Sequence, residues 1–146
     1  MSTNDVVFLL ANGLAGNRQI NRPSAEYDKF KTALECVMAD LAVKMVRDGE
    51  GATKLIKISV INAGSKKDAK AVARSIANSM LFKTAMYGQD PNWGRIMAAA
   101  GSAGVAFNAG KIDVSFTGAA GNINVVKNGK GTRFDENRAK KLLKKN

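Results

Sequence analysis

The stretch that decides the architecture is residues 46–54, which read Val-Arg-Asp-Gly-Glu-Gly-Ala-Thr-Lys. Before it, apolar residues recur at helical spacing, and after it apolar and polar residues alternate as in a strand. The stretch therefore predicts a helix that ends near Asp48 and a strand that follows. The glycines on both sides of Glu50 permit backbone conformations that other residues resist, and they leave the carboxylate unshielded. Such connecting loops are where rigid scaffolds present binding groups. The alternative interpretation is a helix end followed by a solvated acid.

The residues before this stretch predict one strand, one loop and one long helix. Residues 6–10 form a continuous apolar run that is typical of a buried strand, and the polar residues 12–23 indicate a loop. Ser24 is suited to cap a helix whose apolar residues recur at three- and four-residue steps over residues 27–45. Cys36 lies on this apolar stripe, so we interpret it as a core residue.

The residues that follow the stretch 46–54 predict alternating strands and helices. Residues 56–60 alternate between apolar and polar side chains, as in a half-buried strand. Ser65 and Asp68 form a capping-box start for a helix that stops near Asn78. Residues 81–87 are interpreted as a short strand.

Residues 90–96 read Asp-Pro-Asn-Trp-Gly-Arg-Ile and form the second informative motif. Asp90 is expected to cap a helix with Pro91 at its first position, where a missing N–H costs nothing. The free N–H groups of a helix start attract anions, and Arg95 could add charge for a carboxylate or phosphate. The alternative is a plain helix cap in which Trp93 is a packing anchor.

The last third of the chain is dominated by short strand patterns. Asp135 is expected to start a final helix that continues to about Lys145. The expected strands are residues 105–107 and 112–116, joined at residues 108–110, and residues 123–126, followed by a turn at residues 128–129. These hairpin-like pairs predict an α/β class with a mixed sheet and packed helices, in a single region over residues 1–146.

Composition excludes several classes of function. The chain has 146 residues, enough for one domain with a real core, and no apolar run near the ~20 residues that span a bilayer. It has no histidine and one cysteine, so a Ser-His-Asp triad within the chain is impossible, and a zinc site or any other metal site is not expected. One cysteine excludes an internal disulfide and fits a reducing compartment. The N-terminus lacks the pattern of a secretory signal.

The net charge of +11 raises the possibility of nucleic-acid binding. Residues 127–146 contribute +6 of it, through eight basic and two acidic residues, so much of the charge lies on one C-terminal helix with a solvated face. The interleaved aromatic and basic pattern of single-strand binders is absent. We therefore expect no nucleic-acid partner.

Taken together, the motifs resemble the ornithine acetyltransferase family of arginine biosynthesis, also called glutamate N-acetyltransferase. The matching family string is Gly-Glu-Gly-Ala-Thr-Lys, here residues 49–54, and the family shares the string at residues 90–96. Further agreement covers nearly the whole chain, at residues 2–5, 44–47, 73–79 and 134–136. The resemblance implies that Glu50 contacts the substrate. Thr53 and Lys54 also match but receive no role.

The resemblance implies a fold of the N-terminal-nucleophile type and a cytoplasmic enzyme that moves acetyl from N2-acetylornithine to glutamate. Some members also use acetyl-CoA. A precursor cleaves itself before a threonine, which becomes the nucleophile of the β chain, with its own amine as base. The α chain supplies an oxyanion hole, and the chains form an α/β heterotetramer.

The cleavage motif of the family, Ala-Thr-Met-Leu, does not occur in these residues. The chain is therefore expected to be an internal part of the β chain, without the nucleophile segment and the C-terminal end, and inactive by itself. No catalytic residue, metal or cofactor is assigned. Removal of Met1 would expose Ser2 as a hydroxyl nucleophile, but the match places Ser2 well downstream of the family's threonine. The rival interpretation is a non-catalytic module that binds amino acids on the same scaffold.

Overall fold

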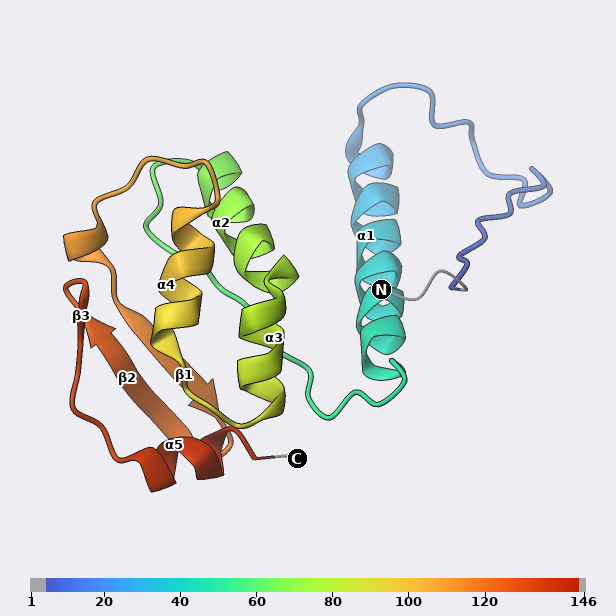
Figure 1. Cartoon of the computed structure of the whole chain (residues 1–146). Helices are drawn as coiled ribbons and strands as arrows, with labels where there is room; N and C mark the ends of the chain where they lie inside the picture. Colours follow the sequence, from blue (N-terminus) through green and yellow to red (C-terminus); the bar gives the residue numbers. More distant parts are fainter. Residues whose placement is uncertain (1–4, 145–146) are drawn as a thin grey trace. The chain divides into compact units, whose positions relative to one another are not determined.

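The computed structural model describes residues 5–144, and its contacts group into two compact units, Met1–Leu55 and Ile56–Asn146 (Figure 1). The first unit contains one helix, α1 (Ala25–Arg47). The second contains α2 (Lys66–Asn78), α3 (Met80–Tyr87), α4 (Trp93–Gly101), a 3-10 turn η1 (Ala109–Lys111), three strands and α5 (Glu136–Leu142). No helix within residues 5–144 is long and apolar enough to cross a membrane.

Helix α1 begins and ends where the sequence predicts. The Ser24 hydroxyl accepts a hydrogen bond from the Tyr27 N–H at 3.2 Å, and Asp48 caps the other end. The expectation of a buried face is wrong, because none of the α1 side chains is buried. Cys36 is accordingly an exposed free thiol, not a core residue.

The strand expected at residues 6–10 does not form. These residues carry neither helix nor strand, and their side chains are between 56% and 90% exposed. A strand is stable only when its backbone groups pair with a neighbour, and the first unit has no strand among the residues described here. Residues 56–60 and 105–107 are likewise unpaired, so these two predicted strands are also wrong.

Three helices of the second unit enclose its main core. Ser65 starts α2 as predicted, since its hydroxyl accepts from the Asp68 N–H and donates to the Asp68 carboxylate. Residues 80–87 form helix α3, so the strand expected at residues 81–87 is wrong. Ser79 caps this helix through the Phe82 N–H. The buried core residues are Ile76, Phe82, Ala85, Met86, Ile96, Ala99 and Ala100.

The sheet is a small antiparallel one in the order β1-β2-β3. Both strand pairs within residues 5–144 are antiparallel, so the parallel pairing of the expected mixed sheet is not found there. Its strands are β1 (Val114–Gly118), β2 (Gly121–Lys127) and β3 (Lys130–Gly131), and a register irregularity lies between Val114 and Ser115. Val114 and Phe116 contact both the helical core and a second cluster formed by Ile123, Val125, Val126 and Ala139. Strand β1 therefore contributes side chains to both clusters of the unit.

Helix α5 starts as expected but is shorter. The Asp135 carboxylate accepts from the N–H groups of Asn137 and Arg138, and the helix ends at Leu142. The expected last residue of this helix, Lys145, lies outside the described residues, as do Ser2 and most of the matching segment at residues 2–5. The predicted turn at residues 128–129 is confirmed, with positive φ at both positions.

Candidate functional site

Glu50 lies at the centre of a tight turn directly after helix α1. The Ala52 N–H donates to the Gly49 carbonyl at 2.9 Å, which closes four residues around Glu50 and Gly51. Gly51 has a φ of 68°, in the left-handed region that favours glycine, so the motif's second glycine is what permits this turn. Within residues 5–144 no hydrogen bond or ion pair involves the Glu50 carboxylate, and the residue is exposed. The turn therefore presents a carboxylate that has no polar partner in the described part of the chain.

The second motif lies in the other unit, between α3 and α4. After α3 and its cap Gly88, Gln89 lies in the left-handed region at a φ of 58°. The Gln89 and Asp90 N–H groups donate to the carbonyls of Met86 and Ala85, which satisfies the end of the helix. The residue that caps α4 is Asn92, whose side-chain oxygen accepts from the Arg95 N–H at 3.2 Å. The prediction that Asp90 is the cap is therefore wrong.

Asp90 instead orients the true cap. Its carboxylate accepts a hydrogen bond from the Asn92 side-chain amide at 3.0 Å. Pro91 precedes the cap and is buried, so it does not stand at the first helical position. The motif thus begins two residues before the capping residue, and its proline fixes the approach to the helix.

The remaining motif side chains bind to the protein itself. Arg95 Nη1 donates to the Leu81 carbonyl at 2.9 Å and to the Thr84 hydroxyl at 3.0 Å, which ties α4 to α3. The ring of Trp93 lies against Gly131, so closely that a Cβ at that glycine would be 2.7 Å from Trp93 Cζ2. These contacts favour the interpretation of the motif as a helix cap with a tryptophan packing anchor.

A cavity of about 590 Å³ opens beside this loop. It is lined by residues 88–94 together with Phe134, Glu136 and Lys140, the last two from α5. Sequence reasoning missed Lys140 as a candidate, because only the packing of α5 brings it to the loop. The one signal in the sequence is that residues 134–136 belong to the strings that match the family.

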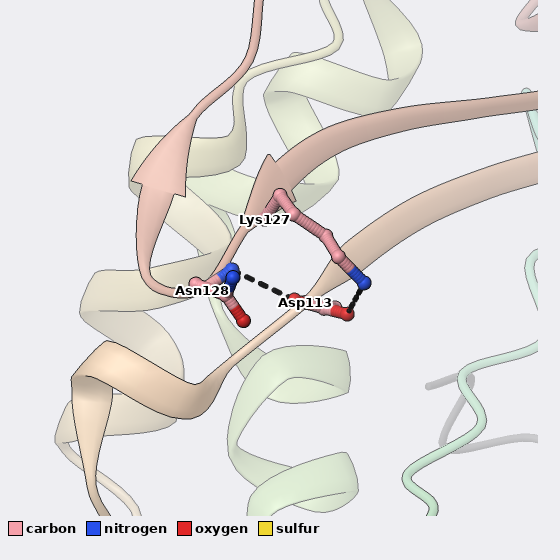
Figure 2. A network of polar contacts seen from close by, with 3 residues as sticks. All are labelled: Asp113, Lys127 and Asn128. Carbon is pink, nitrogen blue, oxygen red and sulfur yellow. Dashed lines mark hydrogen bonds and ion pairs between the residues drawn. The ribbon is translucent and has the colours of Figure 1, made fainter.

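The clearest electrostatic feature lies at the end of the sheet where β1 begins and β2 ends (Figure 2). Asp113 accepts from Lys127 Nζ at 2.6 Å and from the Asn128 N–H at 2.8 Å. These hydrogen bonds, that from Lys127 first, lower the pKa of the Asp113 carboxyl. The network is exposed and fastens the turn after β2 to the segment before β1. Among the residues that the structure describes, no group of three side chains could hold a metal ion.

Comparison with known proteins decides the family. The family model described as the ArgJ family matches residues 1–146. The chain belongs to the ArgJ family. The recognition from the sequence motifs is therefore confirmed.

Two curated ArgJ relatives illustrate the match. The arginine biosynthesis bifunctional protein ArgJ of Thermotoga neapolitana is 50% identical over 142 residues, which is 97% of this chain and 36% of the relative. Its namesake in Caldanaerobacter subterraneus is 48% identical over 144 residues, 99% of this chain and 36% of that relative. The chain thus spans about a third of the length of these relatives.

A solved ArgJ structure supports the fold. The crystal structure of the arginine biosynthesis bifunctional protein from Bacillus halodurans matches with a TM-score of 0.82 at 40% identity, over 98% of this chain and 65% of that chain. The α/β class expected from the sequence, within the fold of this enzyme family, is confirmed.

Proposed function

We propose that this chain is an internal part of the β chain of an ArgJ acetyltransferase and that Glu50 is a residue that contacts the substrate. The proposed parent enzyme moves acetyl from N2-acetylornithine to glutamate, with acetyl-CoA as a further donor to be tested. The observation that carries the proposal is the Glu50 turn, where a motif carboxylate is exposed and has no partner within residues 5–144. The relatives' names, arginine biosynthesis bifunctional protein, support it.

The chemistry assigned to this chain is recognition. A carboxylate pairs with the cationic amine of an amino-acid substrate through charge-assisted hydrogen bonds, which are roughly twice as strong as neutral ones. The nucleophile and the oxyanion hole are proposed to come from other segments of the parent protein. The 146-residue chain alone is then expected to show no turnover, and measurable acetyl transfer by the purified chain would contradict this.

The exposed apolar surface of the first unit supports the proposal that other chains bind to it. Helix α1 has no buried side chain, and the apolar residues 6–10 are exposed. A large apolar area in the first unit is therefore left in contact with solvent. We propose the α chain and further β-chain segments of the same precursor as its partners. Autocatalytic cleavage, an α/β heterotetramer and a cytoplasmic location belong to the same proposal.

A chimera tests the role of Glu50. This chain replaces the 142 matched residues of the Thermotoga neapolitana protein, and acetyl transfer from N2-acetylornithine to glutamate is measured. Glu50→Gln removes the charge but keeps the size. A hydrogen bond to a charged group is worth about 1.5–3 kcal/mol, so kcat/KM is expected to fall about tenfold to a hundredfold.

The matched control is Glu35→Gln, the same chemical change at an exposed position of α1 that lies outside the motif. It is expected to leave transfer unchanged. Equal activity of the Glu50→Gln and parent chimeras would refute the assigned role. A chimera without transfer, combined with ornithine binding that Glu50→Gln abolishes, would favour the binding-module interpretation instead.

A further inference from the structure

The cavity beside the α3–α4 loop combines an apolar lining with a charged one. Pro91 is buried, Phe134 is half-buried, and Trp93 is 36% exposed, so these three side chains supply the apolar lining. Exposed charged side chains of Glu136 and Lys140 supply the other part. A volume of about 590 Å³ lies within the range of small-molecule sites.

Two of the charged side chains on α5, Glu136 and Lys140, line the cavity. Glu136 and Lys140 are four residues apart, with the acid on the N-terminal side, which is the favourable order for an ion pair on a helix. Asp40 and Lys44 have the same order on α1, and they pair at 2.7 Å. Yet within residues 5–144 no ion pair or side-chain hydrogen bond involves Glu136 or Lys140. Helix α5 therefore contributes one anion and one cation to the lining, both available to a ligand.

A third charged group, the Asp90 carboxylate, defines the pattern of charges that a ligand of this cavity must carry. The Asp90 carboxylate also lines it, and the Asn92 amide occupies only one of its oxygens. The charged lining is thus two carboxylates and one ammonium. A ligand that complements it carries an ammonium and a carboxylate on a small frame, with an apolar part to contact the aromatic rings.

We propose that this cavity is a binding site for a free α-amino acid. The ammonium of the ligand contacts Glu136 and Asp90, its carboxylate contacts Lys140, and its side chain packs against Trp93 and Phe134. The residues that line the cavity do not include Glu50. The proposal therefore goes beyond the substrate contact proposed above and can be tested separately from it.

The chain contains its own reporter. Trp93 is its single tryptophan, so both the tryptophan fluorescence and the indole N–H signal in NMR come from the lining of the cavity. The full chain is titrated with norleucine, ornithine and glutamate. We expect a saturable change with at least one of them, with a dissociation constant in the millimolar range.

Ligand analogues test the two charges in turn. N-acetylnorleucine keeps the carboxylate but lacks the ammonium, and pentylamine keeps an ammonium and the apolar chain but lacks the carboxylate. Each is expected to bind about twofold to fivefold more weakly than norleucine, because one exposed charged contact is worth about 0.2–1 kcal/mol. Equal binding of norleucine and both analogues would overturn the proposal, as would a lack of saturation with all three amino acids.

Variants test the residues. Glu136→Gln and Lys140→Gln change exposed side chains that have no hydrogen bond or ion pair within residues 5–144, so the fold is expected to be retained. Each should weaken amino-acid binding about twofold to fivefold. Lys141→Gln is the matched control, since this exposed lysine is on the same helix and does not line the cavity. Glu50→Gln should leave the Trp93 response unchanged. Binding that neither α5 variant weakens would refute the site, whatever the outcome at Glu50.

Discussion

The contact between Trp93 and Gly131 allows the packing role of the second motif to be measured. A Cβ added at Gly131 would lie 2.7 Å from Trp93 Cζ2 and 3.0 Å from Cε2, distances at which the ring has to move. Gly131 does not have a positive φ, so alanine at this position meets a steric obstacle without backbone strain. The substitution Gly131→Ala is therefore a direct probe of how firmly the indole holds α4 against the hairpin.

The expected magnitude follows from two opposing terms. Forcing an extra methyl group into a packed contact costs about 1–3 kcal/mol. Replacing glycine by alanine restricts the unfolded chain, which stabilises the folded state by about 0.4–1 kcal/mol. Gly131→Ala should therefore lower the free energy of unfolding by roughly 1–2 kcal/mol. In a Trp93→Leu background the obstacle disappears, and the same substitution should be neutral or slightly stabilising.

A double-mutant cycle provides the assay. The free energy of unfolding of the parent chain, both single variants and the double variant is measured by urea titration with circular dichroism, because the tryptophan fluorescence is lost with Trp93. The coupling between the two sites is expected to be about 1–3 kcal/mol, with the double variant more stable than the sum of the single effects implies. If Gly131→Ala destabilises both backgrounds equally, the reasoning from the ring contact is refuted.

Three further predictions concern other parts of the chain. Gly129→Ala should destabilise by about 3 kcal/mol, because its Cβ would meet the Ala109 carbonyl oxygen at a positive φ; Gly104→Ala, with a similar φ but open space, should cost only about 1 kcal/mol in the same urea titration. Asp113 has a lowered pKa, so its ionised form stabilises the folded state above the unfolded-state pKa, and this contribution is lost as pH falls through the folded-state pKa. The urea midpoint of the parent chain should therefore fall more between about pH 5 and pH 2 than that of Asp113→Asn; equal slopes would refute this. Cys36 should react with a thiol reagent without denaturant, and protection until unfolding would contradict its exposure.

The features predicted correctly from sequence are those set by neighbouring residues. Ser24, Ser65 and Asp135 each cap a helix as expected, because a cap needs only a side-chain oxygen and the N–H groups two or three residues further along. The Glu50 turn follows equally from its glycines. Residues 81–87 were harder, since a short apolar run fits a strand or a helix, and the Ser79 cap decides for the helix.

The predicted strands that do not form depend on distant residues, unlike the misplaced cap at Asp90, which is a local error. The three predicted strands at residues 6–10, 56–60 and 105–107 have the right local pattern, but a strand exists only where another strand pairs with it. The same limit applies to the cavity. The packing of α5 brings Lys140 to the same cavity as the α3–α4 loop, and no local sequence pattern predicts that proximity.

The Glu50 turn and the cavity differ in the contacts that fix their geometry. Ligand binding at the two sites should therefore respond differently to partner chains. The Glu50 turn is closed by one backbone hydrogen bond after a helix without buried side chains, so its geometry in the isolated chain has little tertiary support. The cavity beside the α3–α4 loop is lined only by residues of the second unit, where buried clusters fix α4, the sheet and α5. Binding at the cavity should therefore be measurable in the isolated chain. Binding at Glu50 should strengthen markedly in the chimera, because partner segments that cover α1 would also order its C-terminal turn.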